Sequence, residues 1–361
     1  MGINARVSLR QVAGKAGVSH STVSLALRAH PSIPEATRTR ILRLAEKMGY
    51  RPDPMLTALN IYRQSRRGAA FQAGLAWLNA FVDRDMLMGN PDCVLYRAGA
   101  EARAKEAGFL LQEFWLQEPG MTPARLAQIL ASRQIQGVLL PPMPFSDTSL
   151  GLPWERFSVV ALGYSHQPVF HVAVTAQYRA ARLATRMLWE RGYRRIGLFT
   201  WPDQEERTDC NFLSGFVCEC SRKGLPVLLC SVDDQRERRE RDAVFYEKWA
   251  KQTAAWIARE RPDALLMPDP QVAIRIGLGP QPKSKRVPSK ESPAVAVLAH
   301  YAKHPWFAGI DQNAARMGAA AVDHLIHMIQ RNERGKPDLP LRILVEGTWR
   351  DGPSVPGVMA H

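Results

Sequence analysis

The sequence predicts an all-α module at the N-terminus, followed by a larger α/β region built from doubly wound parallel sheets. Three observations support this fold class. Apolar residues with helical spacing crowd the first fifty positions, strand-like and helix-like segments alternate from about residue 71 onward, and 361 residues suffice for two or three domains. Hydrophobic residues make up 46% of the chain, so a sizeable core can form.

The N-terminal module begins with two short helices. Residues 9–16 are predicted to be helical because apolar residues recur there at i, i+3, i+4 and i+7. Ser8 precedes this helix as an N-cap, and Gly17 follows it where a left-handed backbone is favoured. Ser19 then caps a second helix over residues 20–27. Two short helices joined by a glycine-containing turn predict a helix-turn-helix.

The second helix carries small polar side chains on its outward face. Hydroxyl groups of this size can approach the major groove of DNA closely and bond to phosphates or base edges. The residues predicted to be exposed on this helix are His20, Ser21, Thr22, Ser24 and Leu25.

A third helix is predicted over residues 33–48, because Pro34 and Glu35 suit a first turn and Gly49 ends the apolar pattern. Four basic residues lie off its apolar face, namely Arg38, Arg40, Arg43 and Lys47. Such a run is usually a solvated helix face. Because this run lies beside a recognition helix, its basic residues could equally contact DNA phosphates. The solvated face and the phosphate contact both stay open as interpretations.

Positive charge is concentrated in this part of the chain. The formal net charge is +14 and the pI is about 9.9. Residues 1–68 hold twelve Lys or Arg against three Asp or Glu. A balance this basic favours a polyanionic partner, either nucleic acid or an anionic membrane surface.

Five cysteines occur without the spacing of a zinc site, which favours reduced thiols. No N-terminal apolar segment resembles a signal peptide, and no run reaches the roughly 18 apolar residues of a membrane span. These features predict a cytoplasmic protein, with no metal and no cofactor expected.

Beyond the N-terminal module, the pattern of residues predicts alternating strands and helices with short connections. Such alternation is typical of parallel, doubly wound sheets. No GxGxxG motif follows the first strand, which disfavours a dinucleotide-binding fold. Strands are predicted at 71–79, 109–114, 137–140, 157–162, 196–199, 226–230 and 264–267, and helices at 93–107, 122–131, 177–190, 212–223 and 250–259.

The N-terminal motifs resemble those of a known family. The segments SLRQVAGKAGVSHSTVSLAL and IPEATRTRILRLAEKMGYRPDPMLTAL are similar to the headpiece and hinge of the LacI (lactose repressor) family. The resemblance implies a sequence-specific DNA-binding transcriptional regulator. It also implies a headpiece at residues 1–50, a hinge helix and linker at 51–68, and an effector-binding and dimerisation domain at 69–361.

The resemblance also implies the residues that contact DNA. His20 and Ser21 take the first base-reading positions, and Leu25 takes the third, where it cannot hydrogen-bond a base but can pack on a thymine methyl group. Leu59 takes the hinge position whose side chain inserts into the minor groove. The remaining predicted DNA contacts are Ser8, Ser19, Thr22, Ser24, Arg28 and Thr37.

The larger region resembles the same family more weakly, through RMLWERGYRRIGLFT, RPDALLMPDPQVAIRI and GIDQNAARMGAAAVDHLI. The implied fold is a periplasmic-binding-protein-like pair of doubly wound lobes with an effector cleft between them. Effector contacts are predicted at Asn79, Trp201, Asp269 and Gln312, each of which also fits an ordinary structural role. Because Phe212 replaces the family's effector-clamping Arg, the cleft fits an ordinary sugar, a less polar ligand or no ligand.

The combined pattern favours a repressor of carbohydrate-related genes that a small ligand controls. Two headpieces on a two-fold axis double the DNA contacts, so a homodimer on a pseudo-palindromic operator is expected. A solute-binding protein for uptake is disfavoured by the headpiece. An enzyme is disfavoured because no HExxH, GxSxG or paired-carboxylate motif accompanies the histidines.

Overall fold

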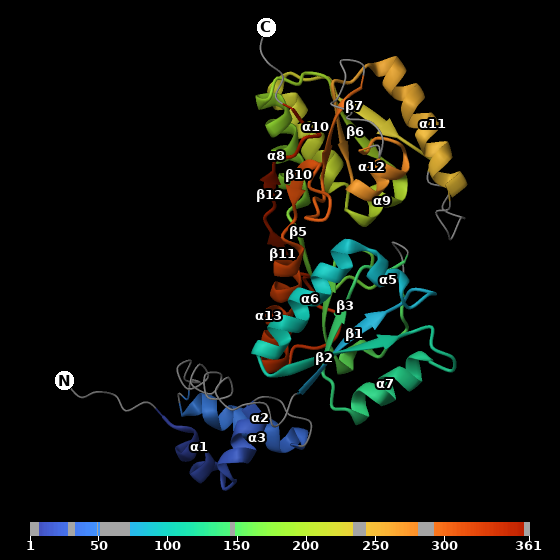
Figure 1. Cartoon of the computed structure of the whole chain (residues 1–361). Coiled ribbons are helices and arrows are strands. Elements are labelled where there is room, and N and C mark those ends of the chain that lie inside the picture. The colour runs from blue at the N-terminus through green and yellow to red at the C-terminus, as the bar shows by residue number, and fades with distance from the viewer. Residues whose placement is uncertain are drawn as a thin grey trace, which may run out of the picture.

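A computed structural model describes residues 7–27, 33–48, 50, 73–144, 149–233, 243–280 and 292–356. The N-terminal module consists of helices α1 (Leu9–Ala16), α2 (His20–Leu27) and α3 (Glu35–Lys47) (Figure 1). Val12, Val23 and Ile41 are fully buried between them. These apolar residues recur at helical spacing, so each helix turns one face inward. The predicted helix-turn-helix is confirmed, and the predicted hinge at 51–68 lies outside the described residues.

Strand β1 (Ala73–Asn79) opens the first lobe, here called the N-terminal lobe. Its six strands run in the order β11-β5-β4-β3-β1-β2, and every pairing within them is parallel. Alternate residues of β1 face opposite sides of the sheet. The other strands are β2 (Phe109–Trp115), β3 (Gly137–Leu140), β4 (Ser158–Leu162), β5 (His171–Thr175) and β11 (Arg342–Val345).

Helices cover both faces of this sheet because both faces are apolar. Leu75 and Trp77 pack against α6 (Pro91–Glu106) and α13 (Ala314–Arg331) on one face. Leu78 packs against α7 (Pro123–Ser132) on the other face. Short helices α5 (Met86–Gly89) and η1 (Trp154–Arg156) lie in the connections.

The second lobe, here called the C-terminal lobe, repeats this plan with the strand order β12-β10-β9-β8-β6-β7. β12 runs antiparallel to β10, and the other pairings are parallel. The strands are β6 (Ile196–Thr200), β7 (Leu228–Ser231), β8 (Ala264–Met267), β9 (Ala294–Val297), β10 (Ala308–Asp311) and β12 (Thr348–Arg350).

Helices again lie on both faces of this second sheet. α8 (Gln177–Glu190) and α10 (Asn211–Lys223) pack on one face, and α11 (Ala243–Glu260) and α12 (Pro270–Arg275) pack on the other. α9 (Pro202–Arg207) follows the end of β6. The helix predicted at 250–259 is longer than expected, because apolar Phe245 and Trp249 extend its buried face toward the N-terminus.

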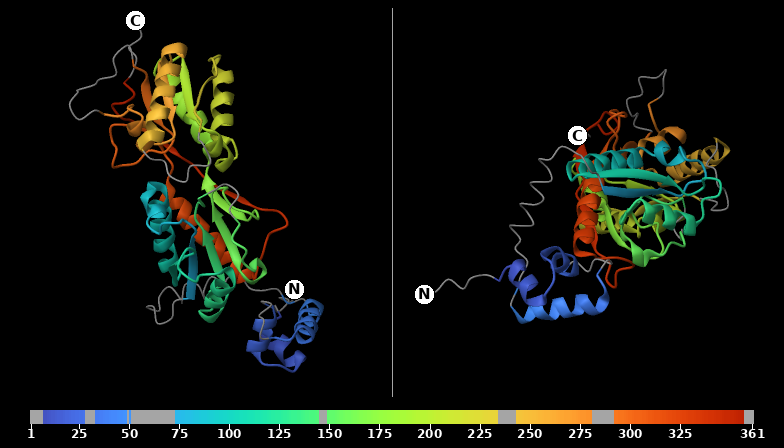
Figure 2. Two further views of the ribbon diagram at one scale, coloured as in Figure 1. Left: turned by 90° about the vertical axis from the view of Figure 1, so that its right-hand side faces the viewer. Right: turned by 90° about the horizontal axis from the view of Figure 1, so that it is seen from below.

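The chain passes between the lobes three times, from β5 to α8, from β10 to α13 and from β11 to β12. Each lobe therefore contains separate stretches of sequence. Figures 1 and 2 show the two lobes in contact, with α13 lying beside α6 in the N-terminal lobe although their sequences are far apart. Gly99 and Gly318 permit this approach, since a Cβ atom at either position would lie 1.9 or 2.0 Å from a backbone oxygen of the other helix.

Candidate functional site

The outward face of α2 is the candidate DNA-contacting surface. Val23 and Ala26 are buried in the core of the module, and this burial turns the N-terminal end of α2 toward solvent. His20 and Ser21 are exposed there, whereas Leu25 is half-buried. Base contacts by these three residues remain predictions, but exposure of the first two is compatible with them.

Three hydroxyl groups lie together at the start of α2. The Oγ of Ser19 accepts a hydrogen bond from the backbone N–H of Thr22 at 3.0 Å. The same oxygen lies 2.8 Å from Oγ1 of Thr22 and 3.1 Å from Oγ of Ser21. A helix N-terminus attracts anions through its free N–H groups and its dipole. This end of α2 is therefore suited to a DNA phosphate.

Ser8 caps α1, as the sequence predicts. Its Oγ accepts from the backbone N–H of Gln11 at 3.4 Å, and the Gln11 side chain accepts from the backbone N–H of Ser8 at 2.7 Å. On α3, Thr37 is half-buried. Contact of Ser8 and Thr37 with DNA stays a prediction. Arg28, Leu59 and the side chain of Ser24 lie outside the described residues.

The four predicted effector contacts lie at strand ends, where open α/β sheets bind ligands. Asn79 ends β1 and is fully buried. Its Nδ2 donates to the carbonyl of Arg84 at 2.9 Å, and its Oδ1 accepts from the backbone N–H of Phe81 at 3.1 Å. These bonds hold the turn after β1. A ligand contact by Asn79 remains a prediction.

Trp201 and Asp269 follow strands of the C-terminal lobe. The Trp201 ring packs at 5.0 Å from Trp249 and 6.1 Å from Phe199 within an aromatic cluster. Asp269 caps α12 by accepting from the backbone N–H groups of Gln271 and Val272 at 2.7 and 3.0 Å. Both side chains thus carry structural contacts of their own, and their contact with a ligand stays a prediction.

Gln312 follows β10, where the chain passes back to the N-terminal lobe. Its Oε1 accepts from Oγ1 of Thr175 at 3.0 Å, and its Nε2 donates to the carbonyl of Leu298 at 2.8 Å. All three residues are buried. The amide therefore joins the end of β5 in one lobe to the end of β9 in the other, while its predicted contact with a ligand stays untested.

Further polar contacts also connect the lobes. Oη of Tyr301 donates to Asp92 Oδ2 at 3.0 Å, and Nη1 of Arg207 donates to the carbonyl of Pro144 at 3.0 Å. Burial raises the pKa of Asp92 to about 7, the Tyr301 hydroxyl lowers it, and the nearby charge of Asp269 raises it further. The Asp92 carboxyl therefore lies at the junction of the lobes, and its protonation state changes near neutral pH.

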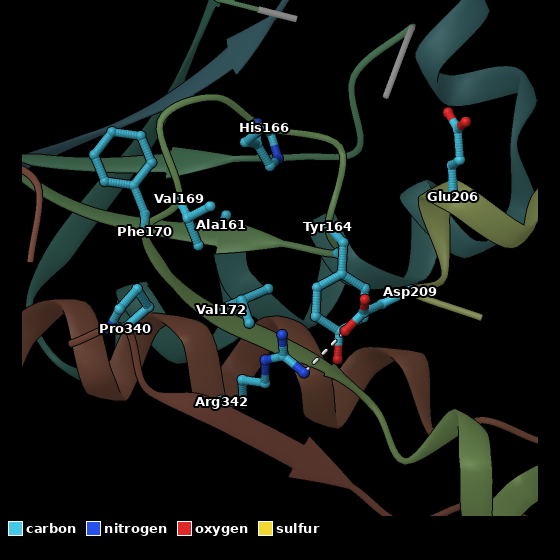
Figure 3. Close-up of a pocket in the computed structure, with 11 residues that line it drawn as sticks. Ala161, Tyr164, His166, Val169, Phe170, Val172, Glu206, Asp209, Pro340 and Arg342 are labelled. Atoms are coloured by element: carbon cyan, nitrogen blue, oxygen red, sulfur yellow. Dashed lines mark ion pairs between the residues drawn. The ribbon is translucent and has the colours of Figure 1, made fainter. Parts of the chain in front are cut away.

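A cavity of about 310 Å³ lies between the β4–β5 loop and the turn after α9 (Figure 3). An ion pair of 3.0 Å joins Arg342 of the N-terminal lobe to Asp209 of the C-terminal lobe beside it. The Arg342 guanidinium also lies 5.1 Å from the ring centre of Tyr164. The lining residues are Ala161, Gly163, Tyr164, His166, Val169, Phe170, Val172, Glu206, Asp209, Pro340 and Arg342.

Sequence reasoning did not assign this cavity to an effector, because its walls come from three distant stretches of the chain. Polar residues following β4 were the one available signal, since β4 ends at the edge where ligands bind in such sheets. Within the described ranges, no group of three or more His, Cys, Asp or Glu residues could hold a metal ion. In the same ranges, no helix is long and apolar enough to cross a membrane.

Known sequences resemble both parts of the chain. A family model described as "Bacterial regulatory proteins, lacI family" matches residues 8–53, and one described as "Periplasmic binding protein-like domain" matches residues 185–351. The HTH-type transcriptional regulator AglR of Rhizobium meliloti is 29% identical over 205 residues, which are 55% of this chain and 53% of AglR. The HTH-type transcriptional repressor CytR of Escherichia coli is 28% identical over 232 residues, 61% of each chain. The aligned region therefore spans between 53% and 61% of these relatives.

Solved structures share the fold. A transcriptional regulator CelR–cellobiose complex matches with a TM-score of 0.56 and 21% identity, over 97% of this chain and 100% of that chain. The lac repressor dimer bound to operator and the anti-inducer ONPF matches with a TM-score of 0.53 and 15% identity, over 97% of this chain and 99% of that chain.

A helix-turn-helix module joined to a two-lobed, periplasmic-binding-protein-like domain defines a class of bacterial regulatory proteins. Residues 8–53 match the LacI-family regulatory module of that class, and residues 185–351 match its periplasmic-binding-protein-like domain. The predicted family and fold class are thereby confirmed.

Proposed function

We propose that this chain is a sequence-specific DNA-binding transcriptional regulator, acting as a repressor of carbohydrate-related genes under the control of a small ligand between its lobes. The observation that carries the proposal is the helix-turn-helix itself. α2 presents exposed His20 and Ser21 beside the hydroxyl groups at its N-terminus, within the region that the LacI family model matches. The relatives AglR and CytR are HTH-type transcriptional regulators.

A homodimer on a pseudo-palindromic operator is part of the proposal. One headpiece reaches few base pairs, and a two-fold pair doubles its contacts at a fixed half-site spacing. The headpiece at residues 1–50, the hinge at 51–68 and the ligand-binding domain at 69–361 are proposed as the working parts. A regulator of genes acts where the DNA lies, so we place it in the cytoplasm.

A saccharide is the proposed ligand class. One structural neighbour, CelR, is a complex with cellobiose, and it shares the two-lobed fold. Chemistry on a bound ligand is not proposed, because the family model that matches residues 8–53 describes regulatory proteins.

Selection of bound sites from random duplex DNA tests this function. We expect recovery of a two-fold symmetric site, with an affinity that falls steeply with salt because phosphate contacts release counterions. His20→Ala is expected to alter the preferred bases, whereas Lys15→Ala, an exposed residue on α1, is expected to leave them unchanged. Leu59→Ala is expected to weaken binding to the selected site far more than binding to unrelated DNA. Recovery of no preferred sequence would refute the proposed function.

A further inference from the structure

The last crossover of the chain forms the outer edge of both lobes. β11 is the outermost strand of the N-terminal lobe's sheet, and β12, which follows it after two residues, is the outermost strand of the C-terminal lobe's sheet. Figure 1 shows the two strands one above the other on the same side of the molecule. Among the described residues, no strand pairs with the outer side of β11. A free backbone edge therefore runs along the N-terminal lobe.

The backbone groups on this free edge follow from the pairing of β11 with β5. The carbonyls of Leu341 and Val345 accept from backbone N–H groups in or just after β5, at 2.9 and 2.8 Å. Because backbone groups alternate in direction along a strand, those of Arg342 and Leu344 point away from β5. The carbonyl of Glu346 accepts from a side-chain amide at 2.8 Å, so the free edge ends there. Unpaired backbone groups of this kind are a template for an added strand.

Apolar side chains are exposed along and beside this edge. Leu344 of β11 is 55% exposed, and Leu341 and Leu339 just before the strand are 53% and 83% exposed. Ile343 and Val345 alternate with them and pack instead in the core that α13 covers. Removal of exposed apolar surface from water favours association. Three exposed leucines beside a free strand edge therefore indicate a contact surface.

Two charged residues flank Leu344 symmetrically. Arg342 lies two residues before it and Glu346 two residues after it, and both side chains are exposed. Charges on an edge strand often prevent pairing with another strand. In this strand their signs select an orientation. Two parallel copies of β11 in register would set like charges opposite each other, whereas two antiparallel copies centred on Leu344 set each Arg342 opposite Glu346 of the second copy.

Each of these charges also has a partner within the chain. Arg342 pairs with Asp209 at 3.0 Å, and Glu346 pairs with Arg179 at 2.9 Å. All four side chains are more than half exposed, and ion pairs between exposed side chains contribute little to stability. The charges of Arg342 and Glu346 are therefore available to a second chain.

We propose that the β11 edge is a contact between two copies of this chain, in which the strands pair antiparallel about Leu344 and the two N-terminal-lobe sheets join into one. β11 runs from the N-terminal lobe toward the C-terminal lobe, so this pairing turns the two copies end for end. The helix-turn-helix lies beyond the far end of the N-terminal lobe (Figure 1). The two headpieces then lie at opposite ends and cannot bind the two halves of one operator. The inference goes beyond the proposed function, because this contact is additional to an operator-bound dimer and joins two such dimers.

Cysteine cross-linking of the full-length chain tests the register. Leu344→Cys places a thiol at the two-fold axis, where opposite Cα atoms of an antiparallel pair lie about 5.5 Å apart. Leu339→Cys is the matched control, because Leu339 is more exposed but lies five residues from the axis, which sets its two copies roughly 34 Å apart in regular strands. A short bifunctional maleimide is expected to link the Leu344→Cys chains. It should leave Leu339→Cys at the wild-type level, which the five native cysteines determine. No linkage of Leu344→Cys above that level, or equal linkage in both variants, overturns the proposal.

Exchange of the two charges tests the orientation, by sedimentation velocity of the chain without DNA. Arg342→Glu and Glu346→Arg each set like charges opposite each other and are expected to weaken self-association about tenfold. The double variant restores opposite charges across the contact but does not restore the pairs with Asp209 and Arg179. Recovery of its self-association to within about threefold of wild type therefore assigns the charges to the second copy. Unchanged self-association in both single variants, or no recovery in the double variant, overturns the proposal.

Binding to the selected DNA site separates this inference from the proposed function. Both single variants are expected to bind one operator as the wild-type chain does, because the contact lies apart from the headpieces. If β11 instead receives a strand of a different protein, the purified chain will sediment alike with and without the charge exchange, which overturns the inference and leaves the proposed function standing. Absence of DNA binding by the wild-type chain would refute the proposed function alone.

Discussion

Replacing Gln312 with Leu tests the connection between the lobes most directly. The Gln312 amide holds the Thr175 hydroxyl and the Leu298 carbonyl, both buried. A buried polar group that loses its partner costs about 1–3 kcal/mol, so Gln312→Leu is expected to lower the free energy of unfolding by about 3 kcal/mol. At a urea dependence of about 3 kcal/mol per M, the unfolding midpoint falls by about 1 M.

The assay is urea unfolding followed by tryptophan fluorescence, at one fixed protein concentration because association shifts apparent stability. Thr175→Val serves as the companion variant, since it removes only the bond to Oε1 of Gln312. The double variant is expected to lose about 1 kcal/mol less than the two single losses combined. A urea midpoint of Gln312→Leu equal to that of the wild-type chain would show that the amide does not join the lobes. Losses of unfolding free energy that add fully in the double variant would show the same.

Three further predictions concern local packing, titration and helix capping. Gly318→Ala places a Cβ atom 2.0 Å from the carbonyl of Tyr96 and is expected to lower the melting temperature, whereas Gly14→Ala, with nothing within 4 Å, is expected to stabilise α1 by about 0.5–1 kcal/mol. In calorimetry, a melting temperature that does not fall in Gly318→Ala would contradict the first expectation, and one that falls in Gly14→Ala would contradict the second. The pKa of Asp92 is raised from 3.8 to about 7 in the folded chain, so its contribution to stability is present below pH about 4 and is lost as the pH rises through 7. Asp92→Asn should make the urea midpoint depend less on pH over that range. A dependence on pH equal to that of the wild-type chain would count against the raised pKa of Asp92. Ser19→Ala removes the cap on α2 and should cost about 1 kcal/mol of headpiece stability in thermal unfolding by circular dichroism, while unchanged melting of the headpiece would refute the role of the cap.

The N-terminal module could be predicted almost completely, because its determinants are local. Ser8, Gly17 and Ser19 mark helix ends through contacts with residues at most four positions away. The buried Val12 and Val23 belong to apolar patterns that fit within single helices of eight residues. The resemblance to the LacI family followed from the same segment, since its motifs sit at fixed spacing and the family model matches residues 8–53.

The ligand region was predictable only at the level of its strands and helices. Asn79, Trp201, Asp269 and Gln312 do lie at strand ends, as the alternating pattern implied. What each side chain does there depends on its partners. Gln312 bonds Thr175, 137 positions earlier in the chain, and no local pattern encodes that distance.

The sequence by itself determined that this protein has a helix-turn-helix followed by doubly wound α/β lobes, because helix caps and apolar periodicity act over a few residues. Only the tertiary structure decided where the lobes meet and what lines the space between them. His166, Asp209 and Arg342 come together because the chain passes between the lobes three times, and the burial of both faces of each sheet fixes that arrangement. The neutral imidazole of His166, whose Nε2 lacks a hydrogen-bond partner, is a product of that burial, since the same nitrogen in water would be hydrogen-bonded by solvent.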